Sequence, residues 1–174
     1  MTDARGLRLR PLRTADESAV RAAHRLMAAS DGFTFGLGLE PGMSWSAYLK
    51  KLDDERAGIA LAVDRVPATF LVAEAGGEIV GRTSIRHTLN DYLREKGGHV
   101  GYGVLPAHRR RGYATEILRQ SLVVARSIGI DRVLVTCDDD NAGSAAVIEA
   151  CGGKLDSLVE DGPGAPPIRR YWID

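Results

Sequence analysis

The sequence predicts an α/β fold of the α+β kind, with one mixed sheet, in a single domain over residues 1–174. Three observations lead to this prediction. The spacing of apolar residues changes along the chain between about 2 and about 3.6 residues, the periods of strands and helices. Glycine and proline stand where the period changes. The chain has 174 residues, and a chain of that length buries roughly 70% of its unfolded surface in one core, so one domain is expected.

The first third of the chain predicts one strand and two helices. Residues 7–10 alternate leucine with arginine, as a half-buried strand does. Thr14 and Glu17 have the spacing of a capping box, so a helix is expected to begin there. It is expected to end at Asp31, because a glycine follows. Residues 45–55 carry apolar side chains at helical spacing, which predicts a second helix.

The rest of the chain predicts a hairpin and then alternating strands and helices. Residues 69–75 and 78–87 are β-rich and are separated by Gly76-Gly77, a pair that suits a tight turn because both turn positions need a positive φ. The elements expected after the hairpin are strand 99–105, helix 114–128, strand 133–137, helix 142–150, strand 155–159 and strand 168–173. The predicted order is therefore β-α-α-β-β-β-α-β-α-β-β.

Composition and charge exclude several classes of protein. The chain carries 23 Lys plus Arg and 23 Asp plus Glu, so its overall field gives no reason to expect nucleic acid or an anionic membrane as partner. It has no run of 18 apolar residues and no apolar region near its N-terminus, which predicts a cytoplasmic protein. Cys137 and Cys151 lack the spacing of a metal site or a disulfide framework, so buried thiols and no bound metal are expected.

Residues 104–115 join the end of a strand to the start of a long amphipathic helix. The first backbone N–H groups of a helix have no intrahelical acceptor, and the helix dipole favours an anion there. Gly112 lets the backbone approach a ligand closely, and Arg109, Arg110 and Arg111 add positive charge. A pyrophosphate fits such a site. A solvated basic loop is the alternative interpretation.

The same passage carries a resemblance to a known family. After a strand that ends in Val-x-Pro, Arg109, Gly112 and Ala114 fill the pattern Arg-x-x-Gly-x-Ala, which resembles the acetyl-CoA-binding motif of the GNAT (Gcn5-related N-acetyltransferase) family. The run from Asn141 through Ser144 to the following Gly pair is similar to that family's Asn-x-x-Ser helix. The order of elements is also similar, so the resemblance covers nearly the whole chain.

The resemblance implies a GNAT-like acyl-CoA N-acyltransferase fold and a specific activity. The protein would transfer an acetyl group from acetyl-CoA, its co-substrate, to a primary amine of a small molecule or a protein N-terminus. Transfer would be direct, within a ternary complex. A catalytically weak or inactive acyl-CoA-binding sensor of the same fold is the alternative.

The resemblance also assigns residues to the co-substrate. Val104 matches the strand position whose backbone meets the pantetheine arm, where two neighbouring strands splay in the family. Asn141 matches a residue that holds the pantetheine, although it would also suit the N-cap of its helix, and Ser144 lies one turn further on. The pyrophosphate loop would consist of Arg109, Arg110, Arg111, Gly112, Tyr113, Ala114 and Thr115.

An amine must lose a proton before it attacks a thioester, and a histidine has a suitable pKa to accept it. The family often has a glutamate where this chain has His99, so His99 is the first candidate base. His87, at the end of the preceding strand, is the second. Glu74 is a weaker third. His99 could equally be a strand-end side chain that faces water.

The thiolate of CoA also needs a proton as it leaves. The family's usual tyrosine falls at Ile148, so the usual acid is missing. Tyr102, Tyr171 or a water molecule could serve, or no acid is needed. Cys137 has no histidine or lysine placed beside it by spacing, which favours a buried thiol over a nucleophile.

In the resembled family the acceptor is chosen by the first two helices, the loop between them, and the loop before the last strand. Two roles are possible for the aromatic residues of this region, packing in the core or lining an acceptor pocket: Phe33, Phe35, Trp45 and Tyr48. The acidic residues of this region could attract a cationic acceptor or could simply form a solvated face: Asp53, Asp54, Glu55, Glu160 and Asp161. The terminal strands would leave sheet edges that a second copy could cover, as in a homodimer.

Overall fold

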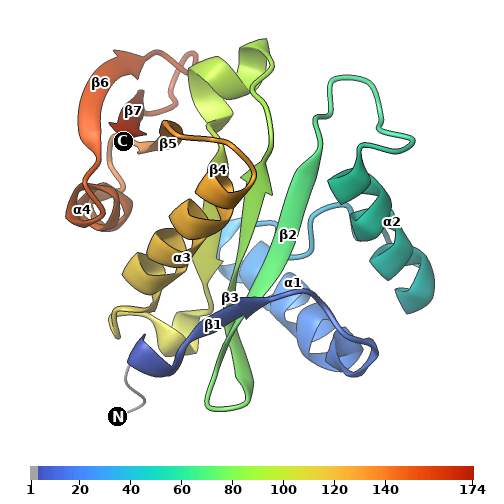
Figure 1. Cartoon of the computed structure of the whole chain (residues 1–174). Coiled ribbons are helices and arrows are strands. Elements are labelled where there is room, and N and C mark those ends of the chain that lie inside the picture. Colours follow the sequence, from blue (N-terminus) through green and yellow to red (C-terminus); the bar gives the residue numbers. More distant parts are fainter. Residues whose placement is uncertain (1–3) are drawn as a thin grey trace.

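Within residues 4–174, seven strands form one mixed sheet and four α-helices cover it (Figure 1). The computed structural model describes residues 4–174, apart from the side chain of Arg5. In spatial order the strands are β1, β2, β3, β4, β5, β7 and β6. Their bounds are β1 Arg8–Arg10, β2 Ala68–Ala75, β3 Glu78–Arg86, β4 Val100–Val104, β5 Val133–Asp138, β6 Lys154–Val159 and β7 Ile168–Ile173. The helices are α1 Glu17–Asp31, α2 Trp45–Ala57, α3 Tyr113–Ser127 and α4 Ala142–Ala150.

The predicted order of elements is confirmed, and most boundaries agree within a residue or two. Gly76 and Gly77 have φ of 59° and 82°, as the hairpin turn between β2 and β3 requires. Gly32 ends α1 with φ of 63°. A π-helical turn, Leu93–Gly97, lies in the polar segment before β4 and was not predicted.

The predicted capping box at the start of the first helix is wrong. Thr14 lies inside a short 3-10 turn, Thr14–Asp16, and α1 begins only at Glu17. Asp16 takes the role expected of Glu17: its Oδ2 accepts a hydrogen bond from the backbone N–H of Arg13, the N-cap of this turn, at 2.6 Å. Glu17 instead pairs with Arg21 on the helix surface at 2.9 Å.

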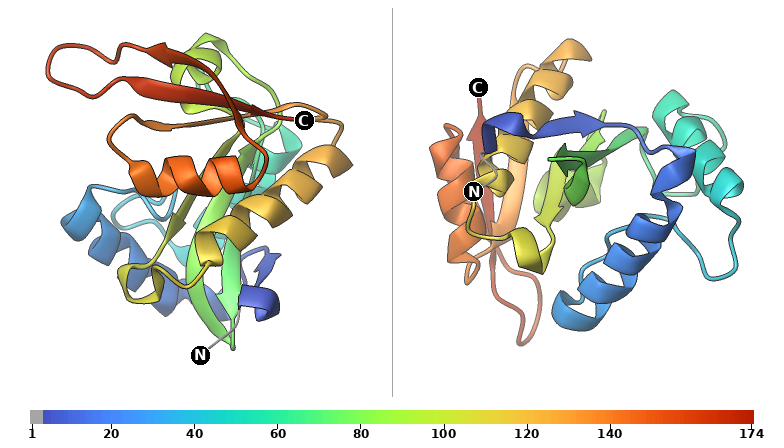
Figure 2. Two further views of the ribbon diagram at one scale, coloured as in Figure 1. Left: turned by 90° about the vertical axis from the view of Figure 1, so that its left-hand side faces the viewer. Right: turned by 90° about the horizontal axis from the view of Figure 1, so that it is seen from below.

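The helices lie in two layers, one on each face of the sheet (Figure 2). Adjacent residues of β2 alternate between the layers, as the pleat of a strand requires. Leu71 belongs to the core beneath α3 and α4, which includes Leu118 and Ile148. Val72 belongs to the core beneath α1 and α2, which includes Tyr48. Of residues 4–174, no helix is long and apolar enough to cross a membrane.

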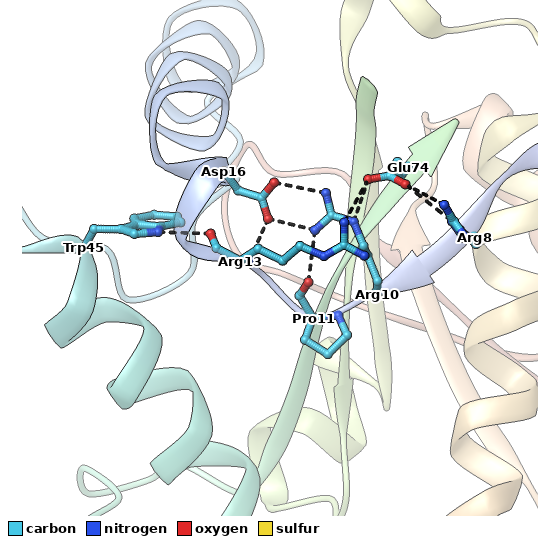
Figure 3. Close-up of polar contacts among 7 residues, drawn as sticks. All are labelled: Arg8, Arg10, Pro11, Arg13, Asp16, Trp45 and Glu74. Atoms are coloured by element: carbon cyan, nitrogen blue, oxygen red, sulfur yellow. Dashed lines mark hydrogen bonds and ion pairs between the residues drawn. The ribbon is translucent and has the colours of Figure 1, made fainter. Parts of the chain in front are cut away.

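A network of buried ion pairs joins β1, β2 and the start of α1 (Figure 3). The guanidinium of Arg10 donates to both carboxylate oxygens of Asp16, at 2.7 and 3.0 Å, and to Glu74 at 2.7 Å. Arg8 donates to the other oxygen of Glu74 at 3.2 Å. Because each carboxylate is held by a guanidinium, the charges are paired where burial would otherwise make them costly.

Strands β4 and β5 are parallel neighbours that pair at only one position, Val100 with Val135. On its other side β4 pairs with β3 along its whole length, from Val100 to Val104. The two parallel strands therefore diverge beyond Val100, and the rest of β4 turns an unpaired edge toward β5. This opening is the feature of the fold that positions the candidate site.

The two terminal strands were predicted to form the edges of the sheet, and one of them does. β1 is an edge strand, but the C-terminal strand β7 is not, because it lies between β5 and β6. β6 forms the second edge. Strand insertion of this kind cannot be read from the order of elements along the chain.

Candidate active site

The loop between β4 and α3 lies beside the opening. Two of its residues have a left-handed backbone: Arg110 with φ of 63° and Gly112 with φ of 79°. No acceptor in the described part of the chain takes the backbone N–H of Arg111, Gly112 or Ala114. These donors stand at the N-terminus of α3, where the helix dipole adds positive potential. The geometry suits an anion such as a phosphate group.

Arg109 holds this loop in place. Its Nε donates to the backbone oxygen of Val104 at 3.1 Å, and its Nη2 pairs with Asp31 at the end of α1 at 2.6 Å. Arg109, Arg110 and Arg111 are all exposed, but Arg109 is held by these two bonds. Arg109 therefore organises the loop, and Arg110 and Arg111 are exposed cations beside it.

Two of the predicted residues lie at the first turn of α4, across the opening from β4. Oδ1 of Asn141 accepts from the backbone N–H of Ser144 at 3.0 Å, which is an N-cap interaction. Oγ of Ser144 in turn lies 2.9 Å from the phenol oxygen of Tyr102 on β4. The structure thus brings Tyr102, Ser144 and Asn141 together.

Tyr102 is protonated at neutral pH. Burial raises the pKa of Tyr102 to about 12, although the hydrogen bond with Ser144 acts in the opposite direction. A phenol in this state can donate a proton but is not a base.

His99 is buried and tied to the neighbouring strand. Its ring Nδ1 accepts a hydrogen bond from the backbone N–H of Leu134 at 2.9 Å. The backbone N–H of His99 donates to the backbone oxygen of Leu134 at 2.7 Å. Burial, followed by the nearby charge of Arg86, lowers the pKa of His99 to about 4. The ring is therefore neutral, and with Nδ1 as acceptor its hydrogen lies on Nε2.

The other two candidate bases lie further from the opening. Nε2 of His87, just after β3, is 2.8 Å from the hydroxyl of Thr69, and burial lowers the pKa of His87. Glu74 belongs to the ion-pair network of Figure 3. Its bond from Arg10 holds its pKa below the usual value. Neither group lies on β4 or β5.

Ile148 is fully buried in the core beneath α3 and α4, so α4 offers no acid at that position. The phenol of Tyr171 donates to Glu149 at 3.1 Å. Cys137 is buried, as predicted, whereas Cys151 is only half-buried. Burial raises the pKa of both thiols, which keeps them protonated.

The residues expected to choose the acceptor are mostly structural. Phe35, Trp45 and Tyr48 belong to the core between α1, α2 and the sheet, so core packing was the correct alternative. Phe33 is half-buried and lies against the guanidinium of Arg82, 4.3 Å from ring centre to Cζ.

Four of the five acidic residues form ion pairs with neighbouring cations. The pairs are Asp53 with Arg56, Asp54 with Lys50, Glu55 with Arg65, and Asp161 with Lys96. Such pairs favour a solvated face over a site for a cationic acceptor. Among the residues the structure describes, no group of His, Cys, Asp and Glu could hold a metal ion.

Two arginines close to β4 were not among the site residues predicted from the sequence. Arg82 and Arg86 lie on β3, four residues apart, and so point to the same side of the sheet. Both are directed toward Gly101 of β4: Arg82 donates to its backbone oxygen at 3.0 Å, and a Cβ built on Gly101 would lie 3.1 Å from Nη1 of Arg86. Their spacing along a strand was the available signal.

A mixed sheet with a splayed parallel pair, beside a helix N-terminus suited to phosphates, agrees with the acyl-CoA N-acyltransferase fold that the resemblance implied. A comparison with models of protein families identifies the family. The model of the acetyltransferase (GNAT) domain matches residues 6–154. The chain belongs to the GNAT acetyltransferase family.

Solved structures support the fold. A putative acetyltransferase from Salmonella typhimurium, yncA, solved with its cofactor acetyl-CoA, is 17% identical with a TM-score of 0.65, covering 97% of this chain and 93% of that one. Spermidine N-acetyltransferase from Vibrio cholerae, in complex with CoA and spermine, is 18% identical with a TM-score of 0.65, covering 97% and 95%. An acetyltransferase from Agrobacterium tumefaciens is 26% identical with a TM-score of 0.61, covering 95% and 90%. No curated protein matches the chain.

Proposed function

We propose that this protein transfers the acetyl group of acetyl-CoA to a primary amine of a small molecule or a protein N-terminus, directly within a ternary complex. The observation that carries the proposal is the opening between β4 and β5 beside a loop of unpaired backbone N–H groups. Membership of the family supports acetyl transfer in general. The amine acceptor and the direct mechanism are the proposed part.

The co-substrate would be held from both sides of the opening. The N–H groups of Arg111, Gly112 and Ala114 would donate to the pyrophosphate, with the exposed guanidinium groups adding positive charge. The backbone of Val104 and the side chain of Asn141 would meet the pantetheine arm. Acetyl-CoA supplies the thioester, whose acetyl carbon is the atom attacked.

In the reaction, a bond forms between the amine nitrogen and the acetyl carbon, and the carbon–sulfur bond breaks. The departing sulfur takes up a proton, and Tyr102 is the proposed donor. Its phenol is protonated at neutral pH, and it lies at the opening, bonded to Ser144. This assignment replaces the tyrosine that α4 lacks at Ile148.

The amine also loses a proton, and we propose that water takes it. His99 cannot readily accept it, because Nδ1 is occupied by the N–H of Leu134 and Nε2 carries the hydrogen. His99 is instead proposed as a positioning residue that fixes β4 to β5 where the opening begins. His87 lies on the far side of β4 from the opening.

The test is an acetyl-transfer assay with a panel of amines and mass detection of the product. Turnover that disappears in Gly112→Glu supports the proposal, because that substitution places a carboxylate among the phosphate donors. Binding of the co-substrate can be followed separately: a ligand at 100 times its Kd stabilises the fold by about 2.7 kcal/mol. No stabilisation at millimolar acetyl-CoA would contradict the assignment of the loop.

The acyl-CoA-binding sensor is the second candidate, and the buried Ile148 favours it because α4 provides no acid. The same assay separates the two functions. Tight binding of acetyl-CoA with no product from any amine would support the sensor. Acetylated product that depends on Tyr102 would support the enzyme.

A further inference from the structure

Arg82 and Arg86 on β3 carry two positive charges without a carboxylate partner. No ion pair within the described residues includes either side chain. Arg82 is only 4% exposed, and a buried guanidinium without a counter-ion is costly. Elsewhere in this protein the buried Arg10 is bonded to two carboxylates. The arrangement on β3 is therefore an exception within the same chain.

Arg82 links β4 to the loop between α1 and α2. Its Nη1 donates to the oxygen of Gly101 at 3.0 Å and its Nη2 to the oxygen of Thr34 at 2.6 Å. Phe33 covers the guanidinium. Its Nε is buried and has no hydrogen-bond partner among the residues that the structure describes. Burial, together with the charge of Arg86, lowers the pKa of Arg82 to about 9.

Arg86 is half-buried and lies against β4 beside Gly101. Its Nη1 donates to the oxygen of Gly97 at 3.1 Å and to that of Gly98 at 3.5 Å, and no partner within residues 4–174 takes the hydrogens of Nε and Nη2. A Cβ on Gly101 would lie 3.1 Å from Nη1 and 3.3 Å from Nη2. A larger residue at this position would push the guanidinium away from the strand.

Burial, followed by the charge of Arg65, lowers the pKa of Arg86, whereas Tyr92 and Glu55 act in the opposite direction. Glu55 lies on α2 and forms its own ion pair with Arg65 at 2.6 Å. Glu55 is therefore already paired with another cation and does not neutralise Arg86.

We propose that the acceptor is a small amine that also carries a carboxylate, as amino acids do, and that Arg86 binds this carboxylate beside Gly101. The inference rests on the proposed function and names its substrate class. A guanidinium donates two parallel hydrogen bonds to a carboxylate, and Arg86 has donors left for both. Arg82 adds a second positive charge and fixes Thr34 over the site. The same two charges disfavour a polycationic acceptor.

The experiment compares matched acceptors. The full-length protein is given acetyl-CoA and a panel of L-amino acids, each beside its own amide, in which the carboxylate is replaced by a neutral group. For the preferred amino acid, kcat/KM is expected to exceed that of the amide by about 100-fold or more, because a site built for a charged group rejects the analogue that lacks it. Equal rates for acids and amides, or a preference for spermine, would overturn the inference.

Variants of Arg86 assign the effect to this side chain. Arg86→Gln is expected to raise KM for the preferred acid by about tenfold or more, the size of one lost charge-assisted bond. Its kcat/KM for the amide is expected to fall by a much smaller factor, so that the preference for the acid over the amide is lost. Arg86→Lys should recover part of the affinity, which separates charge from folding. Arg119→Gln is the control, since Arg119 lies on α3 and pairs with Glu116 at 3.0 Å.

The outcome distinguishes failure of the inference from failure of the proposed function. Acetylation of amides or simple amines but not of acids would leave the enzyme intact and overturn the carboxylate site. If no amine is acetylated, the proposed function fails, and calorimetry of the CoA-loaded protein with the amino-acid panel then decides. Binding of an amino acid to the wild type that is lost in Arg86→Gln supports the anion site. No binding of any amino acid to the wild type overturns it.

Discussion

The phenol oxygen of Tyr102 lies 2.9 Å from Oγ of Ser144, and this bond joins β4 to α4 across the opening of the sheet. The two residues are 42 positions apart in the sequence. They meet because β4 and β5 are neighbours and α4 follows β5 directly. The contact places a protonated phenol at the site where a thiolate would leave.

Tyr102→Phe is expected to lower kcat by about 100-fold, the lower end of the usual contribution of a general acid. The affinity for CoA should change little, because the ring and its packing remain. Steady-state kinetics and calorimetry on the same preparation measure the two quantities. Tyr92→Phe is the matched control, since Tyr92 is 66% exposed. A kcat equal to that of wild type would contradict the role of Tyr102.

Gly112 is expected to be essential for binding CoA. Its φ of 79° strains any other side chain, by roughly 1–2 kcal/mol. Gly112→Ala should therefore weaken CoA binding, and Gly112→Glu should abolish it while the far-UV circular dichroism stays unchanged. Gly129→Ala is the control, because Gly129 has a φ of 89° with open space around it at the far end of α3. Equal CoA affinity in all three variants would contradict the loop assignment.

His99 is expected to make stability depend on pH below neutrality. Its pKa is about 4 when folded and 6.5 ordinarily, so between these values the unfolded chain binds more protons. Stability should therefore fall as pH decreases from 6.5 to 4, by about 3 kcal/mol. Urea unfolding across this range measures the effect. His99→Asn keeps an acceptor for the N–H of Leu134 and should remove most of the dependence. An unchanged slope would contradict the shifted pKa.

The pH profile of the reaction tests whether His99 is a base. If water takes the amine proton, log kcat/KM should rise by about one per pH unit until the pKa of the amine is reached, since only the neutral amine attacks. The rise should be the same in wild type and His99→Asn. A plateau above pH 7 that disappears in His99→Asn would contradict the positioning role and restore the histidine as proton acceptor.

Asp16 is expected to matter for folding and not for function. Burial alone would raise its pKa, but bonds from Arg10 and from the N–H of Arg13 hold it below the usual value. Asp16→Asn should destabilise the fold by about 3 kcal/mol, because Arg10 then loses a buried partner. Glu17→Gln should change stability by less than about 0.5 kcal/mol, as expected of a surface pair. Denaturant unfolding measures both losses, and equal losses in the two variants would contradict the buried role of Asp16.

The sequence allowed the element order to be predicted because each element has its own local signal. The Gly76-Gly77 turn and the stripe of α3 are examples, and so is the motif of Arg109, Gly112 and Ala114. Local signals do not report how strands are ordered in space. The insertion of β7 between β5 and β6 was missed for that reason.

The candidate site was predicted only where the motif lies. The bonds of His99 to Leu134 and of Tyr102 to Ser144 cross between elements far apart in the sequence. The cap of α1 was missed because Asp16 and Glu17 are both acidic, and only the position of Arg10 decides which of them is buried. The arginines of β3 carried no motif, and their lack of carboxylate partners becomes visible only once the strands are placed.

Acetyl transfer itself is the most direct test. Isotopically labelled acetyl-CoA is incubated with wild-type protein and the amine panel, and the products are identified by mass. The expected result is a labelled N-acetylated amine whose rate of formation scales with enzyme concentration and is lost in Gly112→Glu. Binding of acetyl-CoA without any labelled amine, at all enzyme concentrations and across the whole panel, would contradict it.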